Sequence, residues 1–225
     1  MCEKKNNINK KFENYGIFTI GPLERNSGIT FGNMLRRILL NSIKSIGITE
    51  IKYVAKDQNI DKLNTQPEFQ ELILEFSENI KNLVFIENEN QKKQKTIEVL
   101  LEIQKQKRFT AQDLKIPPEI KIVNSNHYLG TNTIFENIEI QVSLGYVDEI
   151  NKKGKDKNNL ITLNSNNFNP IQRVNYKVEK IINIDKLNEQ IILEIWTNGS
   201  ILPKNALVKA INICSNTLQL IKEKL

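Results

Sequence analysis

The alternation of apolar and polar residues divides the chain into strands and helices. Period-two patterns predict strands over residues 15–23, 47–54, 96–103, 120–123, 138–144, 173–184 and 190–197. Three stretches repeat their apolar residues every three to four positions, which predicts helices that begin near Thr30, Pro67 and Pro203. Between Leu83 and Tyr146 the chain offers only short strands, separated by Asn, Gly and Pro. We therefore expect an α+β protein whose middle part is rich in strands.

The first predicted helix has two different sides. Thr30 is its expected N-cap, and the residues at helical spacing on the core side are Phe31, Met34, Leu35, Ile38, Leu39 and Ser42. The opposite side gathers Asn33, Arg36, Arg37 and Leu40. No Asp or Glu occurs between Arg25 and Glu50, so neither arginine has an acidic partner at helical spacing. The pattern favours a docking face, and the alternative is a solvated basic face with one exposed leucine.

The closing helix carries a second apolar surface. Pro203 suits its first turn. Its apolar residues recur at heptad spacing: Leu207, Ile211, Cys214, Leu218, Ile221 and Leu225. Ala206, Ile213, Thr217 and Leu220 broaden this surface on one flank. A heptad seam packs against another helix, whereas the alternative is a core helix whose 3.5-residue periodicity is incidental.

Length and composition set outer limits on the protein. A chain of 225 residues with 39% hydrophobic content can build a real core in one large domain or two small ones. No apolar run approaches the roughly 20 residues that span a bilayer, and residues 1–12 are rich in Lys and Asn. We expect a disordered basic tail over 1–12, no membrane association and no secretory signal.

Catalytic and metal-binding patterns are missing from the sequence. Two cysteines, Cys2 and Cys214, and one histidine, His127, provide neither a disulfide framework nor the spacing of a metal site. We also find no Gly-rich phosphate loop and no nucleophile paired with a base. We therefore expect no catalytic residue, no metal and no cofactor, which disfavours an enzyme that acts alone.

The net charge of +6 and the pI near 9.1 permit contact with nucleic acid. Much of the lysine lies in the tail and in residues 151–159, and loop lysines are weak support for such binding. Ile, Asn and Lys are abundant, whereas the chain has only 4 alanines. An AT-rich genome, which favours AT-rich codons, produces this skew in amino-acid composition, and we call it the codon skew. An independent basic nucleic-acid-binding module is therefore the alternative to a docking protein.

One long segment, Pro22 to Ile43 (PLERNSGITFGNMLRRILLNSI), resembles the signature of the N-terminal domain of the RNA polymerase alpha subunit. Further blocks that resemble this family follow in the same order: FTAQDLKIPP from Phe109, GYV from Gly145, NPIQRVNYKVE from Asn169 and LEIWTNGS from Leu193. Together the blocks span about residues 15–221. The TAQD and WTNGS motifs are similar to those of the chloroplast and cyanobacterial branch of the family. The codon skew favours a plastid genome.

The resemblance implies a two-domain fold, the RNA polymerase alpha N-terminal fold. A discontinuous dimerisation domain of sheet and helices would comprise residues 13–54 and 171–225. A β-rich domain with one helix near 67–81 would be inserted over residues 55–170. Two departures from the family pattern stand out: Leu202 precedes Pro203 where members often have an acidic N-cap, and the loop at 151–159 supports no transfer of residue roles.

The resemblance also implies a function without catalysis. Two copies would form a homodimer, which nucleates assembly of the beta and beta-prime type large subunits. The implied dimer-interface residues are Phe31, Leu35, Ile38, Leu39, Leu207, Ile211, Cys214 and Leu218. The implied large-subunit contacts are Arg36, Arg37, Leu40 and Lys81. Arginine suits such contacts because its planar fork grips a carboxylate or carbonyls at two points.

The resemblance sets expectations about DNA and location as well. Family members usually continue into a small C-terminal domain that touches upstream DNA, and this sequence stops at Leu225. We therefore expect DNA contact only through the assembled polymerase. The expected location is the chloroplast, in the plastid stroma or nucleoid, with the bacterial cytoplasm as the alternative.

Overall fold

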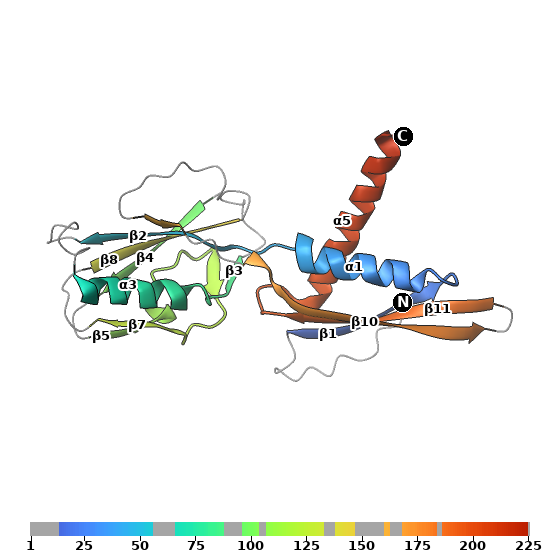
Figure 1. The fold of residues 1–225 in the computed structure, drawn as a ribbon, viewed down its shortest axis with the longest axis horizontal. Coiled ribbons are helices and arrows are strands. Elements are labelled where there is room, and N and C mark those ends of the chain that lie inside the picture. The colour runs from blue at the N-terminus through green and yellow to red at the C-terminus, as the bar shows by residue number, and fades with distance from the viewer. Residues whose placement is uncertain are drawn as a thin grey trace. The chain divides into compact units, whose positions relative to one another are not determined.

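The computed structural model describes residues 14–55, 66–87, 96–103, 107–132, 138–146, 160–162, 168–183 and 186–224 (Figure 1). The chain divides into two compact units. Unit 1 combines Met1–Lys44 with Asn169–Leu225, and unit 2 is Ser45–Phe168. The predicted tail at 1–12, Cys2 and the loop at 151–159 lie outside the described residues.

Unit 1 is built on a three-stranded antiparallel sheet. Its strands are β1 (Tyr15–Leu23), β10 (Ile171–Asn183) and β11 (Lys186–Thr197), in the order β1-β11-β10. Period-two alternation places Ile191, Leu193 and Ile195 of the central strand on the buried face. The pairing of β1 with β11 shifts register between Ile20 and Leu23.

The helix α1 (Gly28–Ser42) packs closely on β10 and β11. A Cβ atom at Gly28 would lie 2.6 Å from Val178 Cγ1, and one at Gly32 would lie 2.5 Å from the Tyr176 ring. Both glycines are therefore needed for the close approach of helix and sheet. The buried stripe of α1 consists of Gly28, Gly32, Leu35 and Leu39.

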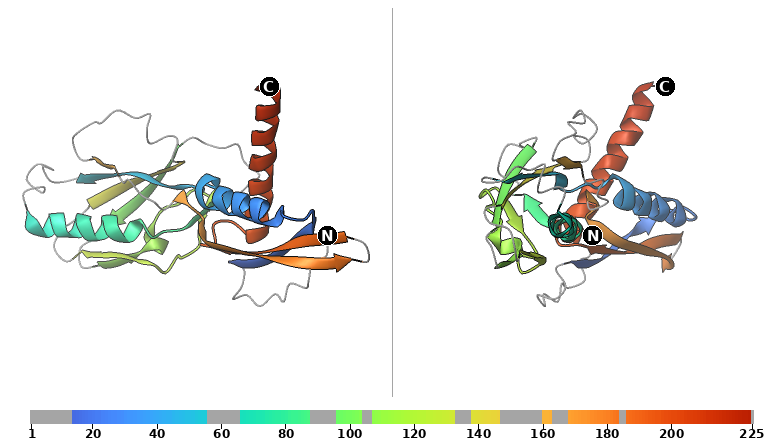
Figure 2. Two further views of the ribbon diagram at one scale, coloured as in Figure 1. Left: turned by 45° about the vertical axis from the view of Figure 1, so that its right-hand side comes forward. Right: turned by 60° about the vertical axis from the view of Figure 1, so that its left-hand side comes forward.

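The helix α5 (Pro203–Lys224) contributes only its first part to the core of unit 1. Its buried residues are Pro203, Ala206, Leu207 and Ala210. Every residue from 215 to 224 is exposed. Figures 1 and 2 show the same arrangement, in which the C-terminal half of α5 stands clear of the sheet and of α1.

Unit 2 has its own sheet and core. Its four-stranded antiparallel sheet has the order β4 (Thr96–Ile103), β8 (Ile138–Gly145), β2 (Gly47–Ala55) and β9 (Leu160–Thr162). Two strand pairs accompany it, β3 (Phe85–Glu87) with β6 (Ile120–Ile122) and β5 (Lys107–Thr110) with β7 (Tyr128–Asn132). A short 3-10 helix, η2 (Ala111–Asp113), follows β5, and α3 (Pro67–Ile80) packs on β7 and inserts Phe69, Phe76 and Ile80 into the core.

The elements differ from the sequence expectations in three respects. The strand over 47–54, which we assigned to the first segment of the dimerisation domain, pairs as β2 with strands of unit 2. The short strands β3, β5, β7 and β9, of three to five residues, were not predicted, although the equally short β6 lies within the predicted strand over 120–123. The first helix begins at Gly28, so Thr30 lies inside it and Ser27 occupies the N-cap position.

Candidate functional site

One flank of α1 and one face of α5 share an apolar surface in unit 1. Met34 Sδ lies 3.5 Å from Cys214 Sγ, and this contact joins the two helices. On the α1 side Phe31 is 42% exposed and Ile38 is half-buried. On the α5 side Ile211 is 44% exposed. We call this set, with Leu218 and Ile221 further along α5, the seam surface.

The residues predicted for a dimer interface divide between this surface and the core. Leu35, Leu39 and Leu207 are buried inside unit 1, where they pack in its hydrophobic core. Phe31, Ile211 and Leu218 are exposed, and Ile38 and Cys214 are half-buried. The structure therefore leaves five of the eight predicted residues available, wholly or in part, to contact another molecule.

The far end of α5 is unusually apolar for an exposed helix. Leu218, Leu220 and Ile221 are each more than half exposed, and they lie within about one helical turn. Single exposed apolar residues are ordinary, but a contiguous group marks an interaction surface. The heptad-spaced apolar residues of α5 from Leu207 to Ile221, which we call the α5 seam, thus continue beyond the core as a surface that no described residue covers.

The arginine face of α1 is less uniform than its sequence indicates. Arg36 Nε donates a hydrogen bond to the Val174 carbonyl of β10 at 3.2 Å. Leu40 is half-buried and packs against the core of unit 1. Arg37 is exposed and has no hydrogen-bond or ion-pair partner among the described residues. Three residues of α1 were predicted to contact large subunits. Among them, Arg37 is therefore the one whose guanidinium makes no hydrogen bond or ion pair with the described residues.

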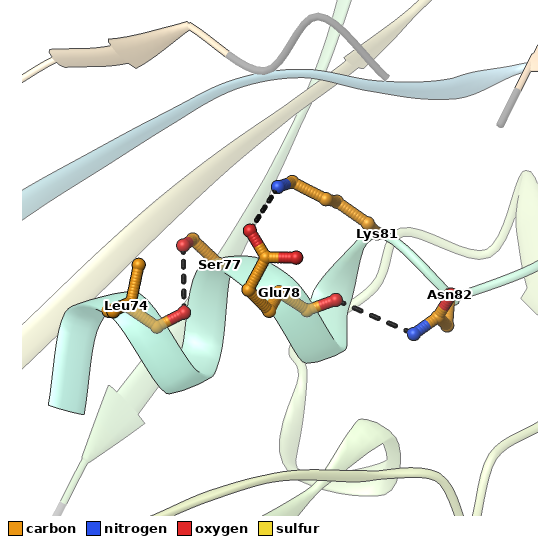
Figure 3. Close-up of polar contacts among 5 residues, drawn as sticks. All are labelled: Leu74, Ser77, Glu78, Lys81 and Asn82. Atoms are coloured by element: carbon orange, nitrogen blue, oxygen red, sulfur yellow. Dashed lines mark hydrogen bonds and ion pairs between the residues drawn. The ribbon is translucent and has the colours of Figure 1, made fainter. Parts of the chain in front are cut away.

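The fourth predicted contact, Lys81, lies in unit 2 at the C-cap of α3 (Figure 3). Its Nζ forms an ion pair with Glu78 Oε1 at 2.5 Å. The Glu78 side chain is largely exposed, so the pair is screened by water and holds Lys81 only weakly. Nearby, the Ser77 hydroxyl donates to the Leu74 carbonyl at 2.9 Å. Lys81 therefore remains available for contact with another molecule.

A buried carboxylate that the sequence analysis missed holds the start of α1. Glu189 of β11 accepts a hydrogen bond from the Asn26 N–H at 3.0 Å through Oε1 and one from the Gly28 N–H at 2.9 Å through Oε2. These two N–H groups, that of Gly28 first, keep the pKa of Glu189 below its usual value despite burial. Glu189 stands at the strand position paired with Leu23, next to the loop that leads into α1.

The face of the unit 1 sheet opposite α1 carries a row of ring contacts across its three strands. The rings of Tyr15 and Trp196 lie 4.8 Å apart, and the Arg173 guanidinium lies 5.1 Å from the Trp196 ring centre. The Tyr15 hydroxyl also donates to Glu194, and burial with this carboxylate raises the pKa of Tyr15 to about 12. Such cross-strand contacts stabilise the sheet that supports α1.

The remaining titratable groups of interest serve local structure in unit 2. Arg108 lies over the Tyr128 ring at 4.8 Å, and the Tyr128 hydroxyl donates to Glu75. His127 Nε2 lies 3.1 Å from the Asn79 carbonyl. Within the described ranges no three His, Cys, Asp or Glu residues are grouped to hold a metal ion, and no helix is long and apolar enough to cross a membrane.

Residues 21–218 match the family model of the RNA polymerase Rpb3/Rpb11 dimerisation domain. The chain belongs to this family. The match confirms the resemblance seen in the sequence, and the mixed helix and sheet architecture agrees with the family fold. All twelve predicted interface residues, from Phe31 to Leu218, lie inside the matched range.

Relatives in this family are named alpha subunits of DNA-directed RNA polymerase. The one from Thalassiosira pseudonana is 32% identical over 217 residues, covering 93% of this chain and 66% of the relative. The one from Syntrophomonas wolfei is 36% identical over 233 residues, covering 99% and 69%. The one from Cyanophora paradoxa is 32% identical over 207 residues, covering 90% and 63%. The chain thus spans about two thirds of the length of these relatives.

Proposed function

We propose that this chain is the alpha subunit, without catalytic activity of its own, of a plastid-encoded DNA-directed RNA polymerase. Two copies form a homodimer, and the dimer scaffolds assembly of the beta and beta-prime type large subunits for plastid transcription. Membership of the dimerisation-domain family supports this proposal. The observation that carries it is the exposed seam surface, whose apolar residues a second copy would cover.

The division of labour between the two sides of α1 supports the scaffold role. The seam flank, with Phe31 and Ile38, adjoins α5 and faces the second copy in the proposal. Arg37 lies on the far side of the helix from the buried stripe, so dimer formation through the seam flank leaves it accessible. A symmetric dimer presents two copies of Arg37, one to each large subunit.

The plastid assignment is supported by algal relatives, among them those of Thalassiosira pseudonana and Cyanophora paradoxa. Bacterial relatives match the chain with similar identity, as the Syntrophomonas wolfei subunit does. The codon skew and the WTNGS block favour the plastid, and the location in the proposal is accordingly the chloroplast. DNA contact occurs through the assembled polymerase.

The alternative function, an independent nucleic-acid-binding module, gains no support from the described residues. Its main basis was the lysine of the tail and of residues 151–159, which lie outside them. Arg108, the arginine of the middle region, is engaged with Tyr128. This alternative stays a prediction, and steeply salt-dependent binding of duplex DNA by the isolated chain would support it.

The scaffold role is tested by replacing Arg37 and following assembly. We expect Arg37→Ala to leave the homodimer intact in sedimentation equilibrium, because Arg37 is absent from the seam surface. Co-purification with the beta and beta-prime type subunits should fall about tenfold or more, since a central arginine contributes strongly to an interface.

Lys209→Ala is the control for this experiment. Lys209 is an exposed cation on the side of α5 away from Leu207 and Ile211, so the variant removes one positive charge outside the proposed contact. We expect it to assemble like the unmodified chain. Undiminished capture of the large subunits by Arg37→Ala would contradict the assignment of the arginine face.

A further inference from the structure

The start of α1 has no cap from its own sequence. The N-cap residue Ser27 makes no side-chain cap, and its hydroxyl instead donates to the Glu24 carbonyl at 2.6 Å. The first turn contains no acidic residue. The first N–H groups of a helix have no acceptor within the helix, and a short polar side chain usually satisfies one of them. In α1 this requirement is met from a distant part of the chain.

Glu189 supplies the missing acceptor across more than 160 residues of sequence. Its two carboxylate oxygens accept the N–H groups of Asn26 and Gly28, one each. Asn26 has a positive φ of 66°, so the turn before the helix is held in a conformation that an L residue rarely adopts. These two hydrogen bonds to one carboxylate, which we call the grip, fix both the turn and the first helical residue.

The surroundings of Glu189 are shaped for an ionised carboxylate. The residue is 7% exposed, and its negative charge faces the positive end of the α1 dipole. Lys180 and Arg25 add favourable charge. A Cβ atom at Gly28 would lie 2.8 Å from Glu189 Oε2, so the glycine provides the space that the carboxylate occupies.

The turn held by Glu189 precedes Phe31, a residue of the seam surface. The Phe31 N–H donates to the Ser27 carbonyl at 3.1 Å, which is the first helical hydrogen bond of α1. Phe31 is therefore anchored to the turn that Glu189 grips, whereas Ile29 and Thr30 have no backbone acceptor among the described residues. Loss of the grip would let this first turn fray, and Phe31 would lose its fixed position.

We infer that Glu189 is a positioning residue for the dimer surface, because its carboxylate holds the first turn of α1 and thereby sets Phe31 against the second copy. The inference rests on the proposed function, since it assigns Phe31 to the homodimer contact. It adds Glu189, a residue of β11 whose carboxylate accepts hydrogen bonds from the turn before α1 and from the first helical residue.

The test is a double-mutant cycle on the dimer dissociation constant of the full chain. We expect Glu189→Gln, which keeps the shape and removes the charge, to raise this constant roughly five- to tenfold. Phe31→Ala should raise the dissociation constant as well. The double variant should have the same dissociation constant as Phe31→Ala alone, because both changes act through the same ring. Glu194→Gln, on the same strand and bonded to Tyr15, is the control and should leave the constant unchanged.

Additive effects of Glu189→Gln and Phe31→Ala would overturn the inference, and so would an unchanged constant in Glu189→Gln. Amide exchange of the unmodified chain gives a second measurement that needs no variant. We expect the Gly28 amide to be protected and the Ile29 amide to exchange much faster. Equal, rapid exchange at both positions would overturn the inference even if the homodimer forms. A stable monomer at micromolar concentration would instead contradict the proposed function, while the exchange of Gly28 would still report on the grip.

Discussion

At the scale of single residues, the unit 1 structure depends on a few polar groups with exact partners. Glu189 satisfies two N–H groups at the start of α1, and Arg36 satisfies the Val174 carbonyl on β10. Arg37, one position further, has no such partner among the described residues. Two adjacent arginines thus have different tasks, one inside the subunit and one at its surface.

The Glu189 contact makes the stability of unit 1 depend on pH. Its pKa is lower in the folded chain than the ordinary glutamate value of 4.5, because the Gly28 and Asn26 N–H groups favour the charged form. The stabilisation is therefore complete above pH 4.5 and is lost as the pH falls through the lowered pKa. We expect the difference in unfolding free energy between the unmodified chain and Glu189→Gln to be largest near pH 7 and to disappear in acid. Denaturant unfolding at a series of pH values measures it, and a difference that persists undiminished at pH 3 would contradict this assignment.

At the scale of elements, the two helices of unit 1 are amphipathic in different ways. Gly28 and Gly32 let α1 lie directly on the sheet, so its Leu35 and Leu39 belong to the core. The closing helix α5 buries only its first turns and carries its apolar spacing out into solvent. A helix whose apolar seam continues past the part that packs on the core of its own subunit is typical of packing in an oligomer.

The seam of α5 yields a prediction for Ile211. This residue is 44% exposed, so Ile211→Asp should change the stability of the separated subunit little. In the homodimer the same change would bury an unpaired charge, and we expect the dimer to dissociate at micromolar concentration. Sedimentation equilibrium measures the outcome.

Asn216→Asp is the matched control, because it adds the same charge to an exposed position on another side of α5. We expect this variant to remain dimeric. A dimer that survives Ile211→Asp would show that the α5 seam is not the contact between the two copies.

At the scale of the whole molecule, the chain builds two separate cores. One consists of side chains from β1, β10, β11, α1 and α5, and the other of side chains from unit 2 alone. Because each unit buries its own apolar residues, a defect in one core should leave the other folded. The single tryptophan, Trp196, lies in unit 1 and reports on that unit by fluorescence.

Phe76 provides the test, since it is fully buried in the core of unit 2. We expect Phe76→Ala to destabilise unit 2 by about 3–5 kcal/mol through lost burial and a cavity. Hydrogen exchange in unit 2 should accelerate, while the Trp196 fluorescence transition in denaturant stays where it is. Leu193→Ala, at an equally buried site of unit 1, is the control that should move the Trp196 transition. A shift of this transition in Phe76→Ala would mean that the units unfold together.

Much of the fold was predictable because it is local. Pro67 and Pro203 mark helix starts by their fixed φ and missing N–H, and the predicted strands over 15–23 and 96–103 agree with β1 and β4. The exposure of Arg37 followed from the helical wheel. The short strands β3, β5, β7 and β9 were not predictable, since only pairing with a neighbour stabilises segments of so few residues.

The sequence by itself determined the family, the helical periodicity of α1 and α5 and the heptad spacing of the α5 seam. Each of these is a property of residue order and spacing. Tertiary structure decided the rest, because it depends on which distant groups meet: the pairing of β2 with other strands of unit 2, the partial burial of Leu40 and the hydrogen bond of Arg36 to Val174. The cap of α1 is the clearest case, since its acceptor lies on a strand 161 residues further along the chain. Only the pairing of β1 with β11 brings that carboxylate to the helix.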